Sequence, residues 1–257
     1  MLGAARRTAR ITASDGRTLI VAFDHGLGGA NVAGMKHPGQ TIRDLIAAGA
    51  DAFLTSPGLA MTYATPLDRV GLILNLDMST GNEEVAVREA LALGAEMGKF
   101  ILTPGNPALP DSIARTRTLV AVCHAWSLPL MVEPIPVSFE ATEQHTPENI
   151  ARGAKIACEV GADIVKMQYP GDAENFRAMM DTLYRPVVIL GGPQRDNDQG
   201  LLQSIRDAMD AGAIGVAIGR NIWSHARPAQ MVAALGAVIH GNASPTEAMR
   251  ELTPAPR

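Results

Sequence analysis

The stretch Gly161-Ala-Asp-Ile-Val-Lys-Met-Gln-Tyr-Pro-Gly-Asp172 holds a lysine inside an apolar segment of strand length. The apolar neighbours of Lys166 favour a buried strand over residues 163–167, and Pro170-Gly171 ends it, so the lysine lies near the C-terminal end. A buried ammonium must be paired or lose its proton. A neutral amine can attack a carbonyl and form a Schiff base. The alternative is a lysine that reaches out of the strand end to pair with a carboxylate.

Apolar runs of strand length alternate with segments of helical period along the whole chain. The expected strands are 17–24, 51–55, 70–76, 99–102, 129–133, 163–167, 186–190 and 214–218. The expected helical segments are 38–48, 58–64, 82–93, 111–126, 146–161, 172–183, 200–211 and 228–239. Strict alternation favours a parallel sheet, and eight such units in 257 residues favour an α/β protein with a closed (β/α)8 TIM barrel. A doubly wound sheet is the alternative.

The chain shows no linker between domains, so residues 1–257 are expected to form a single barrel domain. Residues 1–13 are interpreted as a short segment that closes the bottom of the barrel. Ser244-Pro-Thr-Glu247 has the pattern of a capping box and predicts a short extra helix. Residues 253–257 are expected to be a frayed tail.

Composition excludes several classes of function. A net charge of −4 and an aromatic content of 4% predict no nucleic-acid partner, and no apolar run reaches the length of a membrane span. The N-terminus has no apolar core of a secretory signal, and the two cysteines have no metal-ligand spacing, so a reducing, cytoplasmic location is expected. The six histidines show no ligand spacing either. We therefore expect neither a metal nor another cofactor.

Ionisable residues gather at the expected C-terminal ends of the strands. Asp24 and His25 end the first strand, Asp77 ends the third and Glu133 ends the fifth. In parallel barrels this end carries the active site, with catalytic residues drawn from several strands. Among four lysines, Lys99 is expected to open the fourth strand at its bottom end. Only Lys166 is therefore expected inside the barrel near its top.

Glycine-rich turns follow the seventh and eighth strands, at Gly191-Gly192 and Gly219-Arg220. Glycines let backbone N–H groups approach an anion, and these two loops are the usual phosphate site of such barrels. Arg220 could bind the phosphate with its charged guanidinium, or only with its backbone N–H. The alternative is that the glycines serve tight turns. Asp77 and Tyr169 are further candidates for substrate contact.

Four segments together resemble the archaeal-type class I fructose-bisphosphate aldolases. Relatives of that family include aminodideoxyheptulosonate synthases, the autoinducer-2 phosphate thiolase and deoxyribose-phosphate aldolase. The resemblance runs from the first strand to the eighth helix. The segments are Val21-Ala-Phe-Asp-His-Gly26, 161–172, Val188-Ile-Leu-Gly-Gly-Pro193 and Gly212-Ala-Ile-Gly-Val-Ala-Ile-Gly-Arg-Asn-Ile-Trp223.

The resemblance implies a (β/α)8 barrel with Lys166 as the Schiff-base lysine and Asp24 as its acid/base neighbour. It also implies that the glycine turns and Arg220 bind a substrate phosphate. Homo-oligomers are implied too, often rings of five that stack into decamers. The sequence adds weak support through an apolar C-terminal helix, with Met231, Val232, Leu235, Val238 and Ile239.

The chain departs from the family after the fifth strand. The family has a segment like Ser-Tyr-Pro-Arg-Gly there, whereas this chain has Ile135 in place of the tyrosine and Val137 in place of the arginine. An apolar setting raises the pKa of a carboxylic acid, so Glu133 is the first candidate for the missing proton donor. Asp24 is the other candidate, and the alternative to both is His25, Tyr169 or a water molecule. Loss of the arginine predicts that fructose 1,6-bisphosphate is a poor substrate.

These observations predict a lysine-dependent aldolase that acts on a phosphorylated ketose or keto-sugar through Lys166. Acyl transfer in the manner of the thiolase is a second hypothesis. A sugar-phosphate-binding barrel without catalysis is a third.

Overall fold

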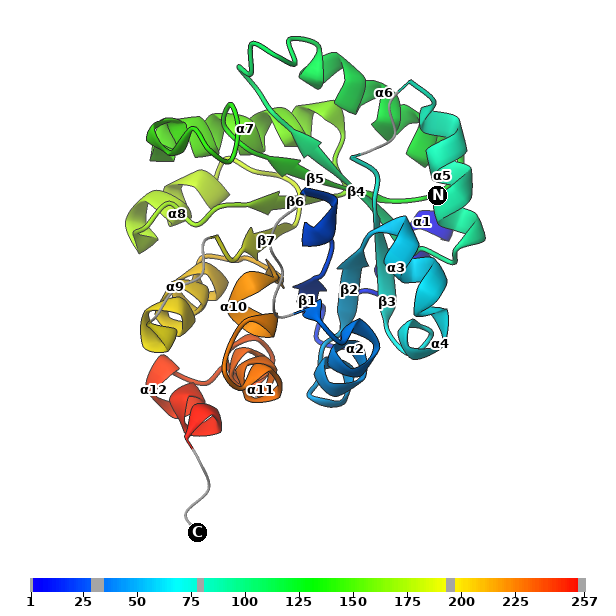
Figure 1. Ribbon diagram of the computed structural model, residues 1–257. Coiled ribbons are helices and arrows are strands. Elements are labelled where there is room, and N and C mark those ends of the chain that lie inside the picture. The colour runs from blue at the N-terminus through cyan, green and yellow to red at the C-terminus, as the bar shows by residue number, and fades with distance from the viewer. Residues whose placement is uncertain (1, 29–34, 78–80, 193–196, 254–257) are drawn as a thin grey trace.

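Eight parallel strands form a closed barrel in the computed structural model, which describes residues 2–28, 35–77, 81–192 and 197–253 (Figure 1). The first and last strands pair with each other, with Thr18 opposite Gly215, so the doubly wound alternative is wrong and the predicted (β/α)8 fold is confirmed. The strands are β1 (Thr18–Ala22), β2 (Ala52–Thr55), β3 (Gly71–Asn75), β4 (Met97–Leu102), β5 (Leu130–Pro134), β6 (Ile164–Met167), β7 (Val187–Leu190) and β8 (Gly215–Ile218).

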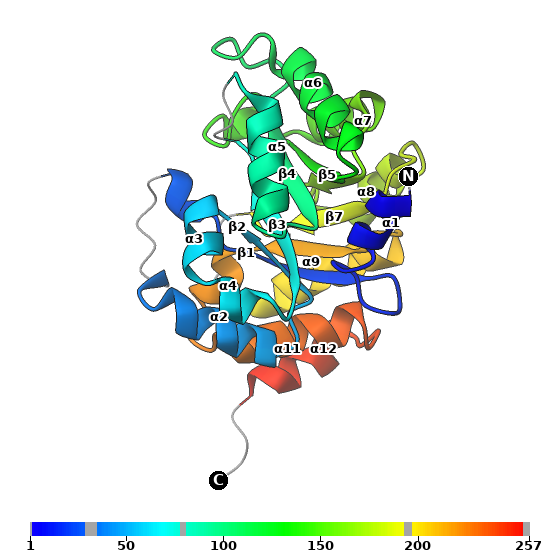
Figure 2. The same ribbon diagram turned by 90° about the vertical axis from the view of Figure 1, so that its right-hand side faces the viewer.

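Helices surround the strands in an outer ring (Figures 1 and 2). The longer ones are α2 (Pro38–Ala47), α5 (Glu83–Ala92), α6 (Ser112–Ala125), α7 (Pro147–Val160), α8 (Ala173–Met180), α9 (Asp198–Asp210) and α11 (Pro228–Ile239). The shorter ones are α1 (Leu2–Thr8), α3 (Pro57–Thr62), α4 (Ala64–Leu67), α10 (Arg220–Trp223), α12 (Pro245–Ala248) and the 3-10 turns η1 (His25–Gly28), η3 (Thr142–Gln144) and η4 (Met249–Leu252). Within the part of the chain that is described, no helix is long and apolar enough to cross a membrane.

Local sequence signals explain where several helices begin and end. Thr146 caps α7 by accepting a hydrogen bond from the Asn149 N–H, and Gly161 ends the helix in the left-handed conformation. The predicted capping box is present at α12, where the Ser244 and Glu247 side chains each bond to the other residue's backbone N–H. Of the predicted tail, residues 254–257 lie outside the described part.

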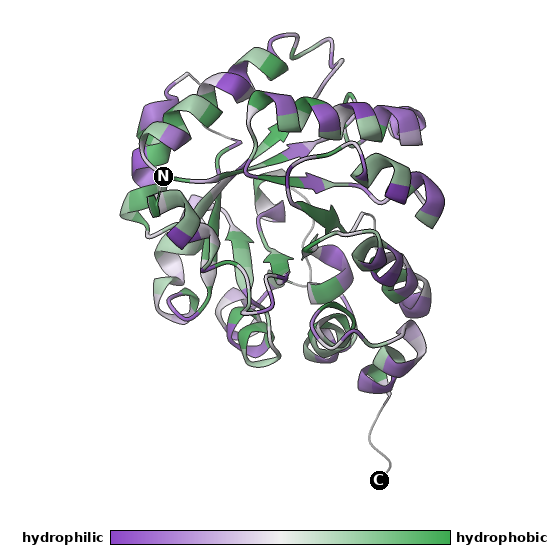
Figure 3. Cartoon of the chain, turned by 180° about the vertical axis from the view of Figure 1, so that it is seen from behind, coloured by the Kyte–Doolittle hydropathy of each residue, from purple (hydrophilic) through white to green (hydrophobic). Residues whose placement is uncertain are grey.

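Figure 3 shows hydrophobic colour along the barrel strands and hydrophilic colour on the outer helix faces. The apolar filling of the barrel consists of one or two inward residues from each strand, including Ile73, Met97, Met131 and Ile164. Ile11, from the segment after α1, is fully buried against this filling, and the Thr18 hydroxyl donates to its carbonyl. The N-terminal segment therefore packs against the start of the strands, where Thr18 begins β1.

The apolar residues of α11 do not form a free surface. Met231, Val232, Leu235, Val238 and Ile239 are all fully buried within the chain's own core. The helix packs against α2, α9, α12 and β1. The sequence argument for oligomers from this helix is therefore wrong, and homo-oligomer formation stays a prediction that rests on the family resemblance.

Closure of the barrel depends on a glycine in β8. Gly215 has φ +151°, and a Cβ atom there would lie 1.8 Å from the Thr18 carbonyl oxygen of β1. We expect Gly215→Ala to lower the unfolding free energy by about 3 kcal/mol or more, because two paired backbones must separate. Gly236→Ala in α11 is the matched control, since no atom lies within 4 Å of its added Cβ. Urea titration should show the control equal to wild type or up to about 1 kcal/mol more stable. If Gly215→Ala were as stable as the control, the close approach of the β1 and β8 backbones at Gly215 could not be what requires glycine there.

Candidate active site

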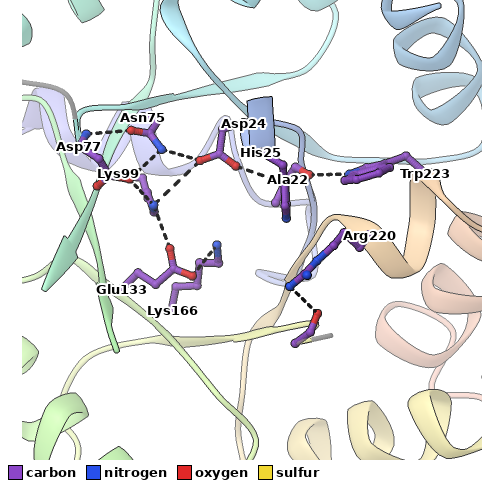
Figure 4. A network of polar contacts seen from close by, with 11 residues as sticks. Ala22, Asp24, His25, Asn75, Asp77, Lys99, Glu133, Lys166, Arg220 and Trp223 are labelled. Carbon is purple, nitrogen blue, oxygen red and sulfur yellow. Dashed lines mark hydrogen bonds and ion pairs between the residues drawn. The ribbon is translucent and has the colours of Figure 1, made fainter. Parts of the chain in front are cut away.

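Lys166 lies inside the barrel near the C-terminal end of β6, with 6% of its surface exposed. Its ammonium is 2.9 Å from Glu133 Oε1 of β5 (Figure 4). A buried lysine was expected either to pair with a carboxylate or to lose its proton, and Lys166 is paired with Glu133. The carboxylate partner is itself buried, so the lysine does not reach out of the strand end to solvent.

Lys99 lies in the same layer, which corrects the prediction that it opens β4 at the bottom. β4 begins two residues earlier, at Met97, so the Lys99 side chain points into the barrel and is 2% exposed. Its Nζ lies 2.7 Å from Asp77 Oδ2, 2.9 Å from Glu133 Oε2 and 3.9 Å from Asp24 Oδ2. Burial opposes the charge of Lys99, but these three carboxylates outweigh it and raise the pKa of the amine above its ordinary value.

Glu133 is held between the two amines, with one carboxylate oxygen on each. The prediction that an apolar setting raises the pKa of Glu133 is wrong. Burial does raise the pKa of Glu133, but Lys166 and Lys99 outweigh burial and lower it to about 2. At neutral pH Glu133 is a carboxylate that can accept a proton, and it has none to donate.

Asp24, just after β1, belongs to the Lys99 side of the layer. Asn75 Nδ2 donates to Asp24 Oδ2 at 2.5 Å and to Asp77 Oδ2 at 2.8 Å. Asp77 Oδ1 accepts from the Ile101 N–H at 2.7 Å, which ties the carboxylate to β4. In the described residues Asp24 contacts Lys99, Asn75 and His25, and the expected direct contact with Lys166 is absent.

His25 adjoins this layer on the β8 side. Its Nδ1 is 3.8 Å from Asp24 Oδ1, and its ring packs edge-on to Trp223 with 5.3 Å between centroids. Burial lowers the pKa of His25, Asp24 opposes this, and Lys166 and Arg220 add to the lowering. The ring is therefore neutral at pH 7, and its Nδ1 is buried with no hydrogen-bond partner among the described residues.

The glycine turns after β7 and β8 face each other, with different reasons for glycine at each position. An added Cβ at Gly219 would lie 2.4 Å from His25 Cε1, and one at Gly191 would lie 2.8 Å from Ile218 Cγ2, so these two glycines are required by packing. Gly192 has φ +65°, and no atom is found within 4 Å of an added Cβ there among the described residues. The exposed Arg220 guanidinium reaches back to the Gly192 carbonyl at 3.4 Å. Pro193, quoted in the sequence motif, lies outside the described residues.

One predicted participant, Tyr169, does not join the layer. The Tyr169 hydroxyl donates to Asp207 of α9, and burial and that carboxylate raise the pKa of the phenol to about 12. Ile135 is fully buried. Tyr169 is thus engaged with Asp207, and Ile135, at the place of the family's tyrosine, has no group that could carry a proton.

Sequence reasoning missed Lys99, Asn75 and Gln168. Gln168 Nε2 donates to His145 Nδ1 at 3.0 Å, and its Oε1 is buried without a partner among the described residues. The sequence does contain a pattern that indicates Lys99 and Asn75, because the inward residues of a strand recur with a period of two. Lys99 stands two residues after the inward Met97, as Asn75 does after Ile73.

A buried amine beside a buried carboxylate, at the catalytic end of a (β/α)8 barrel, is suited to attack on a carbonyl carbon. This site therefore defines an enzyme of the Schiff-base class. Within the described residues, no group of three or more His, Cys, Asp or Glu side chains could hold a metal ion.

Comparison with known proteins agrees with this chemistry. Residues 18–225 match the model of the DeoC/LacD family aldolases, so the chain belongs to that family. It is 34% identical over 255 residues to the 2-amino-3,7-dideoxy-D-threo-hept-6-ulosonate synthase of Halobacterium salinarum, a match that covers 95% of this chain and 96% of the relative. It is 29% identical to the class 1 fructose-bisphosphate aldolase of Thermoproteus tenax, covering 90% and 93%.

Solved structures show the same likeness. A crystal structure of an archaeal fructose 1,6-bisphosphate aldolase has a TM-score of 0.82 and 28% identity, covering 93% of this chain and 99% of that one. A second such structure, with its catalytic lysine covalently bound to the carbinolamine intermediate of the substrate, also has a TM-score of 0.82 and 28% identity, covering 93% and 100%. The chain is thus a class I aldolase, a carbon–carbon lyase.

The charge on Glu133 makes stability depend on pH. Its pKa falls from an ordinary 4.5 to about 2 on folding, so the carboxylate stabilises the fold fully above pH 4.5. This contribution is lost as the pH falls from 4.5 towards 2. We expect Glu133→Gln to be less stable than wild type at pH 7, because two buried ammonium groups lose their shared partner. The difference in unfolding free energy should shrink below pH 4.5. A difference that is constant from pH 7 to pH 3 would contradict the assigned charge.

Proposed function

We propose that this class I aldolase cleaves and forms a carbon–carbon bond in a phosphorylated ketose or keto-sugar, through a Schiff base on Lys166. The observation that carries the proposal is the pairing of two buried lysines with one glutamate. The pairing makes the two amines chemically different.

Lys166, and not Lys99, is the nucleophile in this proposal. Lys99 has three carboxylates within 4 Å and a raised pKa, so it keeps its proton and cannot attack a carbonyl. Lys166 has Glu133 as its one recorded carboxylate partner among the described residues. Lys99 therefore acts as a fixed positive charge that keeps Glu133 ionised.

The steps follow from this charge arrangement. Lys166 first gives its ammonium proton to solvent water, and the neutral amine adds to the ketone carbon. A proton of the added nitrogen moves to the former carbonyl oxygen, and a proton returned from solvent lets the carbinolamine hydroxyl leave as water. The iminium nitrogen that forms carries the same positive charge at the same place as the ammonium, so its attraction to Glu133 is kept. The iminium then accepts the electron pair of the breaking carbon–carbon bond, which gives an enamine and a free aldehyde.

Cleavage needs a base for the hydroxyl proton next to the breaking bond. Glu133 is proposed for this role, because it is ionised and lies 2.9 Å from the Lys166 amine. Asp24 and the neutral His25 flank the layer and are proposed to hold substrate hydroxyls. Asp77 is proposed to position Lys99.

The phosphate is proposed to bind at the turns after β7 and β8. Support comes from the open space beside Gly192, the exposed Arg220 and the usual place of phosphate in these barrels. The curated relatives include aldolases named for fructose bisphosphate. Val137 replaces an arginine of that family, so fructose 1,6-bisphosphate itself is proposed to be a poor substrate.

Borohydride trapping tests the nucleophile. With a phosphorylated ketose, reduction should inactivate the enzyme and add the mass of the reduced adduct to the peptide that contains Lys166. Lys166→Met should abolish the adduct. The chain has four lysines, so the other three serve as internal controls. An adduct on Lys99, or full activity in Lys166→Met, would refute the assignment.

Single-turnover kinetics test the base. Glu133→Gln should still give the trapped adduct, since the amide keeps the shape of the site, but carbon–carbon cleavage should slow by about 10² or more. His25→Asn and Tyr169→Phe are the comparisons. A Glu133→Gln protein that cleaves at the wild-type rate would rule Glu133 out, and an equal loss in Tyr169→Phe would point to the phenol.

Inhibition by inorganic phosphate tests the anion site. Arg220→Gln should raise KM about tenfold and weaken competition by phosphate to a similar degree, because a charge-assisted contact is lost. Arg88→Gln, on an exposed position of α5, is the matched control and should change neither. Equal KM values for phosphorylated and unphosphorylated substrates in wild type would remove the phosphate from the proposal.

A further inference from the structure

A second concave site lies beside the polar layer, where β4 and β5 give way to their loops. It is a pocket of about 450 Å³. One wall is the segment after β4, with Leu109 and Pro110, and another is Phe139 from the segment after β5. Phe100 and Ile101 of β4 also line the pocket. The volume is in the range of sites that hold small organic molecules.

The walls of this pocket are mainly apolar, yet several of its apolar side chains are left open to solvent. Leu109 is 50% exposed and Phe139 is 46% exposed. Val137 lies two residues before Phe139 and has φ +60°, a rare conformation for a β-branched residue. Its Cγ2 lies 3.9 Å from the position of an added Cβ on Gly105, so the two loops meet beside the pocket. Such strain persists where surrounding structure requires it, often at binding sites.

Asp77 joins the pocket to the reacting groups. It lines the pocket and accepts a hydrogen bond from Lys99 at 2.7 Å. Lys99 contacts Glu133, and Glu133 contacts Lys166, at 2.9 Å each (Figure 4). Three consecutive contacts thus lead from the pocket to the proposed nucleophile.

The pocket and the glycine turns lie on opposite sides of the barrel mouth. The strands follow chain order around the closed barrel, so β3 and β4 lie opposite β7 and β8. A substrate with its phosphate at the β7–β8 turns and its carbonyl at Lys166 would direct its other half towards β4. That half is the one released as the aldehyde.

The charges around the pocket disfavour a second phosphate. Three carboxylates line it, from Asp77, Asp111 and Glu140. Asp77 is paired with Lys99, which leaves Asp111 and Glu140 against one guanidinium, from Arg115. Arg115 is itself engaged, with its guanidinium 5.2 Å from the centre of the Phe100 ring and its Nε 3.8 Å from Glu83. A dianion would meet net repulsion, whereas an uncharged chain would cover exposed apolar surface.

We propose that this pocket binds the aldehyde half of the substrate, and that this half carries an uncharged, apolar chain. The inference rests on the proposed function and specifies its second reactant. In cleavage, the electron pair of the carbon–carbon bond passes to the iminium on Lys166, the hydroxyl proton passes to Glu133, and the neutral aldehyde remains in the pocket.

Binding of an unreactive analogue tests the pocket apart from catalysis. 3-Phenylpropan-1-ol, which cannot form a Schiff base, should show saturation transfer in NMR with wild type and with Lys166→Met alike. Ala108→Trp should fill the pocket and Phe139→Asp should make it polar, and both should abolish the signal. Met61→Asp is the matched control, because Met61 is 58% exposed on α3, outside the pocket, and it should bind as wild type does.

Aldol addition tests the assignment to the aldehyde. The donor is the phosphorylated ketone that gives the borohydride adduct on Lys166. We expect 3-phenylpropanal to be a better acceptor than glyceraldehyde 3-phosphate, and Ala108→Trp and Phe139→Asp to raise KM for 3-phenylpropanal about tenfold or more. Met61→Asp should leave both the KM for 3-phenylpropanal and the yield of trapped adduct unchanged.

The outcomes separate the two proposals. If no ketone is trapped on Lys166, the proposed function fails, and the aldehyde assignment fails with it even if the alcohol binds. If the adduct forms but glyceraldehyde 3-phosphate is the better acceptor, or both pocket variants leave 3-phenylpropanal unaffected, only the pocket assignment is overturned. A change of mass in light scattering with Phe139→Asp would instead assign this surface to contact between copies of the chain.

Discussion

One buried carboxylate, Glu133, holds two buried amines, and the rest of the site depends on this pairing. A buried ammonium without a partner would destabilise the barrel or lose its proton. Sharing one carboxylate between Lys99 and Lys166 satisfies both charges, but unequally, because Lys99 also has Asp77 and Asp24. The asymmetry separates the two lysines into a fixed charge and a reactive amine. A Schiff base suits such a site, since the iminium keeps the charge that Glu133 balances.

The barrel provides this pairing through the alternation of its strands. Inward side chains recur every second residue, so a polar layer lies one step above an apolar one. The apolar layer, closed from below by Ile11, excludes water beneath the charges and makes their mutual attraction stronger than it would be at the surface. Asn75 and the backbone of β4 then fix the outer carboxylates, so the layer is held from several strands at once.

The two sides of the barrel mouth differ in chemistry. The β7–β8 side has an open glycine turn and an exposed arginine, which suit an anion. The β4–β5 side has an apolar pocket with a surplus of carboxylates, which suits an uncharged chain. In the proposed function, the two sides bind the two halves of the substrate and Lys166 reacts between them. Ile135 and Val137, at the positions where the resemblance implies a tyrosine and an arginine, follow β5 and so belong to this second side.

The sequence by itself determined the fold and the position of Lys166, because both depend on local pattern. Eight apolar runs with helical segments between them allow few arrangements, and the motif around the lysine carried the family resemblance. Only the tertiary structure decided the partners of each ionisable group. A two-residue error in the start of β4 changed the expected place of Lys99, and with it the environment and charge of Glu133. Tyr169 is only three residues from Lys166 in sequence, but its hydroxyl donates a hydrogen bond to Asp207 of α9. A pKa and a pocket depend on side chains that several distant strands bring together, and no single stretch of sequence contains that information.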